Sequence, residues 1–197
     1  MLHHILVMHK HYKIYKPYGY LSQFVNNQNK RRNKKLLSDL FNFSKETMAI
    51  GRLDEKSEGL LLLTTDGKFS EYIRSAKVEK EYHVMVDGII TLKHIEKLKN
   101  GVEISLNGKP YITKSCEAEI LKDTSHIINR FVRDERHGTT SWLSITITEG
   151  KFRQVRKMTA SIGLPTLRLV RIRIGEYTLD SLKPGDSEEI NSHHSLP

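Results

Sequence analysis

Two short apolar runs, at residues 48–50 and 60–63, enclose a polar stretch of the chain. Each run is bounded by glycine and consists of residues that suit a buried strand. The stretch between them is turn-like, so it places Asp54 where the chain leaves one core strand before it enters another. Arg52 lies two residues earlier, and its side chain points to the same face as Asp54 if the segment is extended. A neighbouring guanidinium favours the ionised carboxylate that a nucleophile or general base requires, whereas the alternative is a polar hairpin whose aspartate bonds its own turn amides.

The remaining pattern predicts a chain rich in strands, with about four helices. Alternating apolar and polar residues predict strands at 11–15, 21–25, 79–86, 115–121, 142–148 and 167–174. In the last of these the alternation slips between Leu169 and Val170, which predicts a bulge there. Helical spacing predicts helices at 36–41, 69–73, 92–98 and from the stretch at 149–158 to Ile162. The chain beyond the turn at 183–186 is expected to be loose.

Composition limits the class of protein. A chain of 197 residues with 38% apolar content is long enough to bury a core, as one domain or two tightly joined lobes. Its apolar runs fall short of the roughly 20 residues of a membrane span, and a cytoplasmic protein is expected. The single cysteine, Cys116, excludes an internal disulfide and a cysteine-cluster metal site. The sequence has neither the ligand spacing of a zinc site nor a phosphate-binding glycine loop, so we expect neither a metal nor a cofactor.

The net charge of +9 favours a polyanionic partner, and the excess cations gather in three segments. Residues 30–35 carry five cations in six positions. The polar segment 122–140 contains Arg130, Arg133, Arg136 and His137, and the strand at 167–174 carries Arg168, Arg171 and Arg173. The first two segments are either phosphate-binding loops or solvated loops, and the pattern leaves that choice open.

The stretch at 149–158 is the second segment with candidate chemistry. Arg153, Arg156 and Lys157 stand at i, i+3 and i+4, so they are predicted to share one face near the N-terminal end of a helix. Such a face suits a phosphate or a carboxylate, and the alternative is a solvated helix surface.

Three motifs in order resemble those of RNA pseudouridine synthases, in the branch of the RsuA/RluE-type ribosomal RNA enzymes. They are Arg-Leu-Asp-x-x-Ser-x-Gly-Leu-Leu at 52–61, Lys80-x-Tyr82, and Gly-x-x-x-Gln-Val-Arg-Lys-Met at 150–158. The resemblance implies that Asp54 is the catalytic residue and that Arg156 pairs with it. It also implies that Tyr82 packs against the target base. Arg52 would then hold a backbone phosphate or the space that an extruded base leaves.

The resemblance also implies an α+β fold, with a mixed, mainly antiparallel sheet, flanking helices and a central basic cleft. We expect one catalytic domain at 10–190, in two lobes around that cleft, between loose tails at 1–9 and 191–197. Residues 16–24 resemble the start of the RluE-type catalytic domain, which leaves no room for an S4-like domain in front. The expected partner is ribosomal RNA, most directly that of the large subunit, and a monomer suffices. The expected RNA-binding residues are Lys30, Arg31, Arg32, Lys34, Lys35, Lys80, Arg153, Lys157, Arg168 and Arg171.

Three alternatives stay open from the sequence. The same isomerisation on 16S ribosomal RNA or transfer RNA would use the same residues. A non-enzymatic RNA-binding or ribosome-assembly protein explains the charge, but it gives no reason for matching Asp54 with Arg156. A hydrolase with Asp54 and Glu58 as its carboxylate pair has no accompanying metal-ligand set. Within the favoured function, Asp54 acts either as a nucleophile or as a base.

Overall fold

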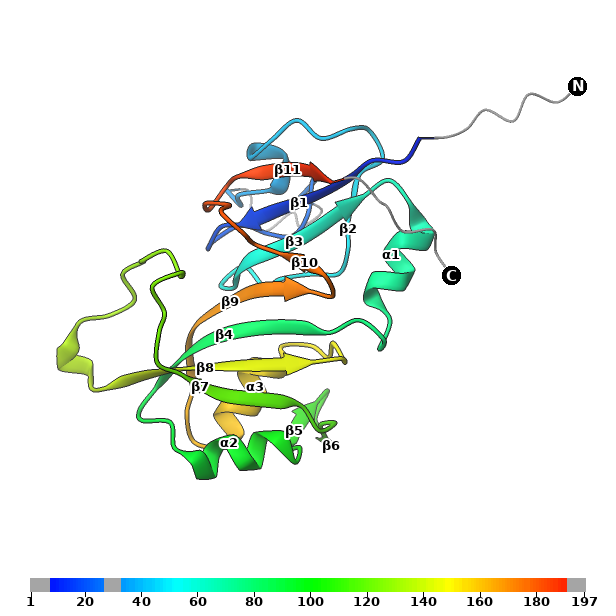
Figure 1. The fold of residues 1–197 in the computed structure, drawn as a ribbon. Helices are drawn as coiled ribbons and strands as arrows, with labels where there is room; N and C mark the ends of the chain where they lie inside the picture. The colour runs from blue at the N-terminus through cyan, green and yellow to red at the C-terminus, as the bar shows by residue number, and fades with distance from the viewer. Residues whose placement is uncertain (1–7, 27–32, 191–197) are drawn as a thin grey trace, which may run out of the picture.

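The computed structural model describes residues 8–26 and 33–190, and in them a nine-stranded sheet carries the fold (Figure 1). Its main path runs in the order β11-β1-β3-β9-β4-β8-β7, while β2 pairs with β3 and β10 pairs with β9. The strands are β1 (His11–Lys16), β2 (Met48–Ala49), β3 (Glu58–Thr64), β4 (Lys80–Asp87), β7 (Glu117–Leu121), β8 (Thr140–Ile147), β9 (Thr166–Ile174), β10 (Tyr177–Thr178) and β11 (Ser187–Ile190). A separate hairpin pairs β5 (Glu103–Leu106) with β6 (Lys109–Ile112).

The pairing of β3 with β9 is parallel, whereas the other pairs of the sheet are antiparallel. It joins one half of the sheet, built on β11, β1 and β3, to the other, built on β9, β4, β8 and β7. Three α-helices accompany this part of the chain: α1 (Gly67–Arg74), α2 (Leu92–Lys99) and α3 (Gln154–Ser161). The expected α+β class with a mixed, mainly antiparallel sheet is therefore confirmed.

Strand β3 explains why the run at 60–63 lacks alternation. Leu60 and Leu62 pack into one core cluster with Phe69 of α1, whereas Leu61 and Leu63 pack into another with Tyr12 of β1. The strand is buried on both faces, so both sets of side chains are apolar. A third cluster fills the space between β4, β8 and β9 on one side and α2, α3 and β5 on the other.

Most predicted elements lie where the pattern places them, but two near the N-terminus were wrong. Residues 21–25 form no strand, and the nearest pairing is a single parallel bridge between Tyr20 and Lys35. The helix expected at 36–41 is one 3₁₀ turn, Leu37–Asp39. The side chain of Asp39 accepts a hydrogen bond from the amide of Leu36, which closes this turn locally. The helical spacing of apolar residues in this segment does not mark the apolar face of a helix. Leu37 is buried in the core although it lies in a short turn.

Two expectations about the C-terminal part also need correction. Residues 187–190 are not loose, because β11 pairs with β1 as the edge strand of the sheet. Polar residues are typical of an edge strand, so the segment showed no apolar alternation. The predicted bulge is misplaced: β9 pairs regularly through Leu169 and Val170, and the register against β4 shifts around Leu167 and Ile172 instead.

Within residues 8–26 and 33–190, no helix has the length and apolar character to cross a membrane. The prediction of one catalytic domain at 10–190 stays a prediction.

Gly59 marks the point where β3 and β9 approach most closely. It pairs with Arg171, its φ is +105°, and a Cβ atom would lie 2.3 Å from the carbonyl oxygen of Arg171. That contact is with backbone, so it cannot be relieved by a rotamer change.

We predict that Gly59→Ala lowers the free energy of unfolding by about 3 kcal/mol or more, through strain and strand separation. Urea unfolding curves of the two proteins measure this. The control is Gly67→Ala at the start of α1, where no atom lies within 4 Å of the added Cβ and alanine favours the helix. Equal losses in the two variants would contradict the close approach.

Lys16 of β1 pairs with Gly59 of β3, and its side chain is fully buried. Its ammonium donates to the carbonyl oxygens of Tyr20, at 2.7 Å, and Pro17, at 2.9 Å. Burial lowers the pKa of Lys16 to about 7, with Glu58 opposing the shift and Arg171 adding to it. In the unfolded chain the pKa of Lys16 is near 10.5. Between pH 7 and 10.5 the unfolded chain therefore keeps a proton on Lys16 that the folded protein releases, so the free energy of unfolding rises with pH in this range.

We therefore predict that wild type gains stability over Lys16→Met as pH rises from 7 to 9, by up to about 1.4 kcal/mol per pH unit. Urea unfolding of both proteins at several pH values in this range tests the prediction, because other titrating groups are common to both. Parallel pH profiles would show that Lys16 keeps its ordinary pKa.

Candidate active site

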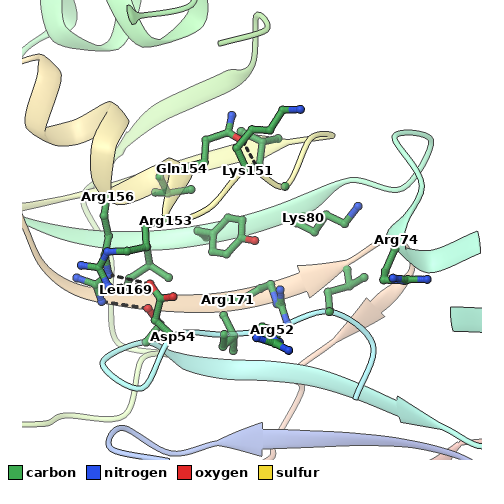
Figure 2. A pocket seen from close by; sticks show the side chains of 18 of the residues that line it. Arg52, Asp54, Arg74, Lys80, Lys151, Arg153, Gln154, Arg156, Leu169 and Arg171 are labelled. Atoms are coloured by element: carbon green, nitrogen blue, oxygen red, sulfur yellow. Dashed lines mark hydrogen bonds and ion pairs between the residues drawn. The ribbon is translucent and has the colours of Figure 1, made fainter. Parts of the chain in front are cut away.

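A pocket of about 250 Å³ opens beside Asp54 and is lined from both halves of the sheet (Figure 2). The loop between β2 and β3 forms one side, the turn before α3 forms another, and β4 and β9 contribute the residues between them. Among the described residues, its charged lining consists of one carboxylate and seven cations: Asp54, Arg52, Arg74, Lys80, Lys151, Arg153, Arg156 and Arg171. Such a pocket suits an anionic ligand.

The backbone at Asp54 is held from both sides. The preceding residue, Leu53, is buried in the core, and its amide and carbonyl both bond the hydroxyl of Ser22, at 3.0 and 2.8 Å. After Asp54 the chain closes a turn, in which the amide of Ser57 donates to the carbonyl of Asp54 at 2.9 Å. Core packing and hydrogen bonds thus fix where the Asp54 side chain begins.

Two arginines from the start of α3 approach the Asp54 carboxylate. Arg153 donates to Oδ2 at 3.2 Å, and the Nε atom of Arg156 lies 3.8 Å from the same oxygen. The second contact is too long for a hydrogen bond and is an ion pair. The two guanidinium groups place positive charge beside the carboxylate. The prediction that Arg156 pairs with Asp54 agrees with this geometry, although Arg153 is nearer.

Arg156 also fastens the loop that carries Asp54. Its terminal nitrogen donates to the carbonyl of Lys56 at 2.7 Å and to the hydroxyl of Ser57 at 3.0 Å. Burial and the neighbouring Arg153 lower the pKa of Arg156, whereas Asp54 opposes that shift. One guanidinium therefore positions the loop and places positive charge beside its carboxylate.

The prediction that the three cations at 153–157 share one helical face was wrong. Helix α3 begins only at Gln154, and Arg153 precedes it in a left-handed conformation with φ of +53°. Lys157 does not line the pocket, because its ammonium donates to the carbonyl of Ser105 at 2.7 Å. Arg52 lines the pocket and is exposed, but within the described chain it forms no ion pair with Asp54.

The turn before α3 is held by a buried hydrogen-bond network centred on Glu149. Its carboxylate accepts from Gln154 at 2.6 Å, Lys114 at 2.9 Å and Tyr111 at 2.5 Å. Burial alone would raise the pKa of Glu149, but these hydrogen bonds outweigh it and lower the pKa. Gln154 in turn accepts from the amide of Lys151 at 3.0 Å. The sequence pattern assigned no role to Glu149, although this residue opens the stretch at 149–158.

Tyr82 and Arg171 lie next to each other in the pocket, from β4 and β9. The guanidinium carbon of Arg171 is 5.9 Å from the centre of the Tyr82 ring. Arg171 is only 5% exposed and donates from Nε to the carbonyl of Leu60 at 2.8 Å. One of its terminal nitrogens is buried without a hydrogen-bond partner in the described part of the chain. A buried donor in this state lacks the partner that such groups normally have, so the site is suited to a ligand acceptor.

Lys80 lies farther along the same pocket (Figure 2). Its ammonium donates to the carbonyls of Val78, at 2.6 Å, and Ser75, at 3.1 Å. Burial and then Arg171 lower the pKa of Lys80 to about 8.

Glu58 forms a second charge cluster, outside the pocket lining. This buried carboxylate accepts from Arg168 at 2.7 Å and from Arg130 at 2.9 Å. Arg168 is itself 3% exposed and also donates to the carbonyl of Ile128, at 2.8 Å. The expectation that Arg168 leaves its strand toward RNA is therefore corrected: its guanidinium is used inside the protein. Because both oxygens of Glu58 are engaged, Glu58 and Asp54 do not form the free carboxylate pair of the hydrolase alternative.

The polar segment at 122–140 is tied back to the sheet by two of its arginines. Arg130 pairs with Glu58 and lies over the ring of Tyr18, 4.3 Å from its centre. Arg133 binds Asp87 through two hydrogen bonds, at 2.5 and 3.0 Å. Arg136 pairs locally with Asp134. This segment is thus held by ion pairs to its own chain.

The predicted basic loop at 30–35 is only partly visible, since Lys30, Arg31 and Arg32 lie outside the described residues. Lys34 pairs with Glu55 at 2.5 Å, and the ammonium of Lys35 lies 5.5 Å from the centre of the Tyr20 ring. Neither lysine lines the pocket. A search of the described residues finds no group of three histidine, cysteine or acidic side chains arranged to hold a metal ion.

Comparison with known proteins gives consistent matches in sequence and structure. The family model described as RNA pseudouridylate synthase matches residues 10–161. The "Ribosomal large subunit pseudouridine synthase E" of Vibrio vulnificus is 43% identical over 179 residues, which cover 89% of this chain and 73% of that protein. A protein of the same name from Xanthomonas axonopodis pv. citri is 41% identical, over 86% of this chain and 87% of its own. A solved structure described as "Crystal structure of pseudouridylate synthase" aligns with a TM-score of 0.74 and 27% identity, covering 93% of this chain and 71% of that one.

The Glu58 cluster yields a prediction about stability. We expect Glu58→Gln to lower the free energy of unfolding by about 3–5 kcal/mol, because it leaves the buried Arg168 without its counter-charge. Chemical denaturation of the variant and wild type measures the loss. Glu189→Gln, which breaks the exposed pair with Lys10, serves as the control and should cost less than about 1 kcal/mol. A Glu58 variant as stable as this control would show that the cluster contributes little.

Proposed function

This chain belongs to the RNA pseudouridine synthase family, and on that premise we propose that it converts one uridine to pseudouridine in a stem-loop of large-subunit ribosomal RNA. The choice of RNA rests on the relatives from Vibrio and Xanthomonas, whose names state that they act on the large ribosomal subunit. The observation that carries the chemistry is Asp54, the carboxylate of a pocket whose other charged lining residues are cations, held by Arg153 and Arg156.

The proposed reaction is an isomerisation, so its atoms balance within the substrate. The bond between the sugar C1′ and N1 of uracil breaks, the base rotates, and C1′ bonds to C5. The proton lost from C5 is balanced by the proton gained at N1. Asp54 acts at the sugar, either as a nucleophile or as a base, and both routes need an ionised carboxylate. The ion pairs with Arg153 and Arg156 hold the carboxylate in place beside positive charge.

Tyr82 and Arg171 are the proposed groups that bind the base. The target uridine must leave its stack to reach Asp54, and an aromatic ring in the pocket replaces the lost stacking, worth about 1–3 kcal/mol per base. Tyr82 provides that ring. The unpartnered nitrogen of Arg171 beside it would donate to a carbonyl oxygen of the uracil or to its phosphate.

The other cations of the pocket suit the RNA backbone. Arg52 is exposed at the pocket, while Arg74 and Lys80 lie at its far end from Asp54 (Figure 2). These cations would neutralise the phosphates that flank the extruded uridine. Arg52 would alternatively occupy the space that the extruded base leaves in the RNA. Apolar walls from Leu53, Val155 and Leu169 help to exclude water, which would otherwise add to C1′ after the base has detached and leave an abasic sugar.

We predict that Asp54→Asn abolishes detectable pseudouridine formation while retaining RNA binding, because the amide keeps the shape but not the charge. Unmodified large-subunit ribosomal RNA, 16S ribosomal RNA and transfer RNA are each incubated with the enzyme and mapped by carbodiimide-stop primer extension. Wild type should give one new stop, in the large-subunit RNA. Asp123→Asn, in a loop outside the pocket, should behave as wild type.

The same experiment separates the alternatives. A stop in 16S or transfer RNA would keep the enzyme but change its substrate. If wild type modifies none of the three RNAs and still binds them, the non-enzymatic RNA-binding alternative replaces this proposal.

A further inference from the structure

Phe152 is a large apolar side chain on the surface beside the pocket, and it is 70% exposed. It stands between Lys151 and Arg153, both of which line the pocket, but Phe152 itself does not. A single exposed apolar residue is ordinary in a folded protein. The residues around Phe152 therefore determine whether this ring has a further role.

The turn that carries Phe152 is held in one conformation. The amide of Gln154 donates to the carbonyl of Lys151 at 3.1 Å, and the buried side chain of Gln154 bonds both Lys151 and Glu149. Arg153, the next residue, adopts a left-handed conformation and reaches Asp54. The backbone on both sides of Phe152 is thus fixed relative to the pocket, so its side chain begins at a fixed place beside the pocket.

One cation contacts the ring, and two more are its neighbours in sequence. The ammonium of Lys157 lies 5.3 Å from the ring centre, and its hydrogen bond to the carbonyl of Ser105 holds it there. The neighbours in sequence, Lys151 and Arg153, add two more positive charges. An exposed aromatic ring among cations is the combination that binds a nucleobase together with its phosphates. An apolar protein surface would gain nothing from these charges.

We propose that Phe152 stacks on an unpaired base that adjoins the target uridine in the RNA. This inference rests on the proposed function, and it divides the aromatic contacts between two residues. Tyr82 receives the extruded base inside the pocket, whereas Phe152 holds the neighbouring nucleotide outside it. Extrusion removes a stacking partner from that neighbour, and the ring of Phe152 replaces it. Phe152 is thus a positioning residue: it sets which nucleotide stands at the pocket without touching the reacting atoms.

The test compares four variants on a ribosomal RNA stem-loop that contains the modified uridine. Phe152→Ala should lower kcat/KM by about 10-fold or more, mainly through KM, because a base stack is lost. Phe152→Trp should restore it, while Phe152→Leu, which keeps the apolar surface without the ring, should not. Phe41→Ala is the matched control. Phe41 is 50% exposed and lies beside β1 and β11, at the other edge of the sheet.

Two further readouts separate stacking from other roles. With 2-aminopurine next to the target uridine, wild type should change its fluorescence on binding, and Phe152→Ala should lose that change. The dependence of binding on salt should stay the same in Phe152→Ala, since no phosphate contact is removed. Urea unfolding confirms that the variants fold.

The outcomes distinguish the two proposals. If wild type forms no pseudouridine, the proposed function fails. If wild type is active and Phe152→Ala matches Phe41→Ala, only the role of Phe152 is overturned. Full activity of Phe152→Leu would also overturn it, because the ring would then act only as apolar surface.

Discussion

The close approach of β3 and β9 at Gly59 is the constraint on which the rest of the structure depends. A side chain at this position would collide with the backbone of Arg171, so the two halves of the sheet meet only because Gly59 has none. This meeting brings Glu58 within reach of Arg168 and places Arg171 beside the ring of Tyr82. The loop before β3 that carries Asp54 therefore faces β4 and β9, and the pocket forms between them.

Electrostatics assigns different tasks to two carboxylates only four residues apart. Glu58 is buried, and two arginines engage both of its oxygens, so its charge serves the packing of the sheet. Asp54 lies in the pocket, where Arg153 and Arg156 both contact Oδ2. A buried carboxylate must be paired to stay charged, whereas one in an open pocket can be held ionised and still react.

The pocket and its surroundings match the needs of base extrusion from RNA. Inside, Tyr82 offers a ring and Arg171 an unused donor, and the surrounding cations suit the phosphates on either side of the uridine. Outside, the turn before α3 presents Phe152, and the ammonium of Lys157 lies 5.3 Å from the centre of its ring. One short segment, 151–156, thus contributes two arginines that contact Asp54, further positive charge to the pocket and the exposed ring of Phe152. Its rigidity comes from Gln154 and Glu149.

The sequence by itself determined the strand at β4 and the helices α1 and α2, because periodicity reports which face is buried. It also determined the family, because each motif is a continuous stretch of residues, and that resemblance implied the α+β class. It also predicted that Asp54 and Arg156 act together. Only the tertiary structure decided the parallel pairing of β3 with β9, the edge strand β11, and the use of Arg168 inside the protein. These features depend on partners about 100 residues or more away, and a local pattern shows that a residue is buried or charged without showing what it meets.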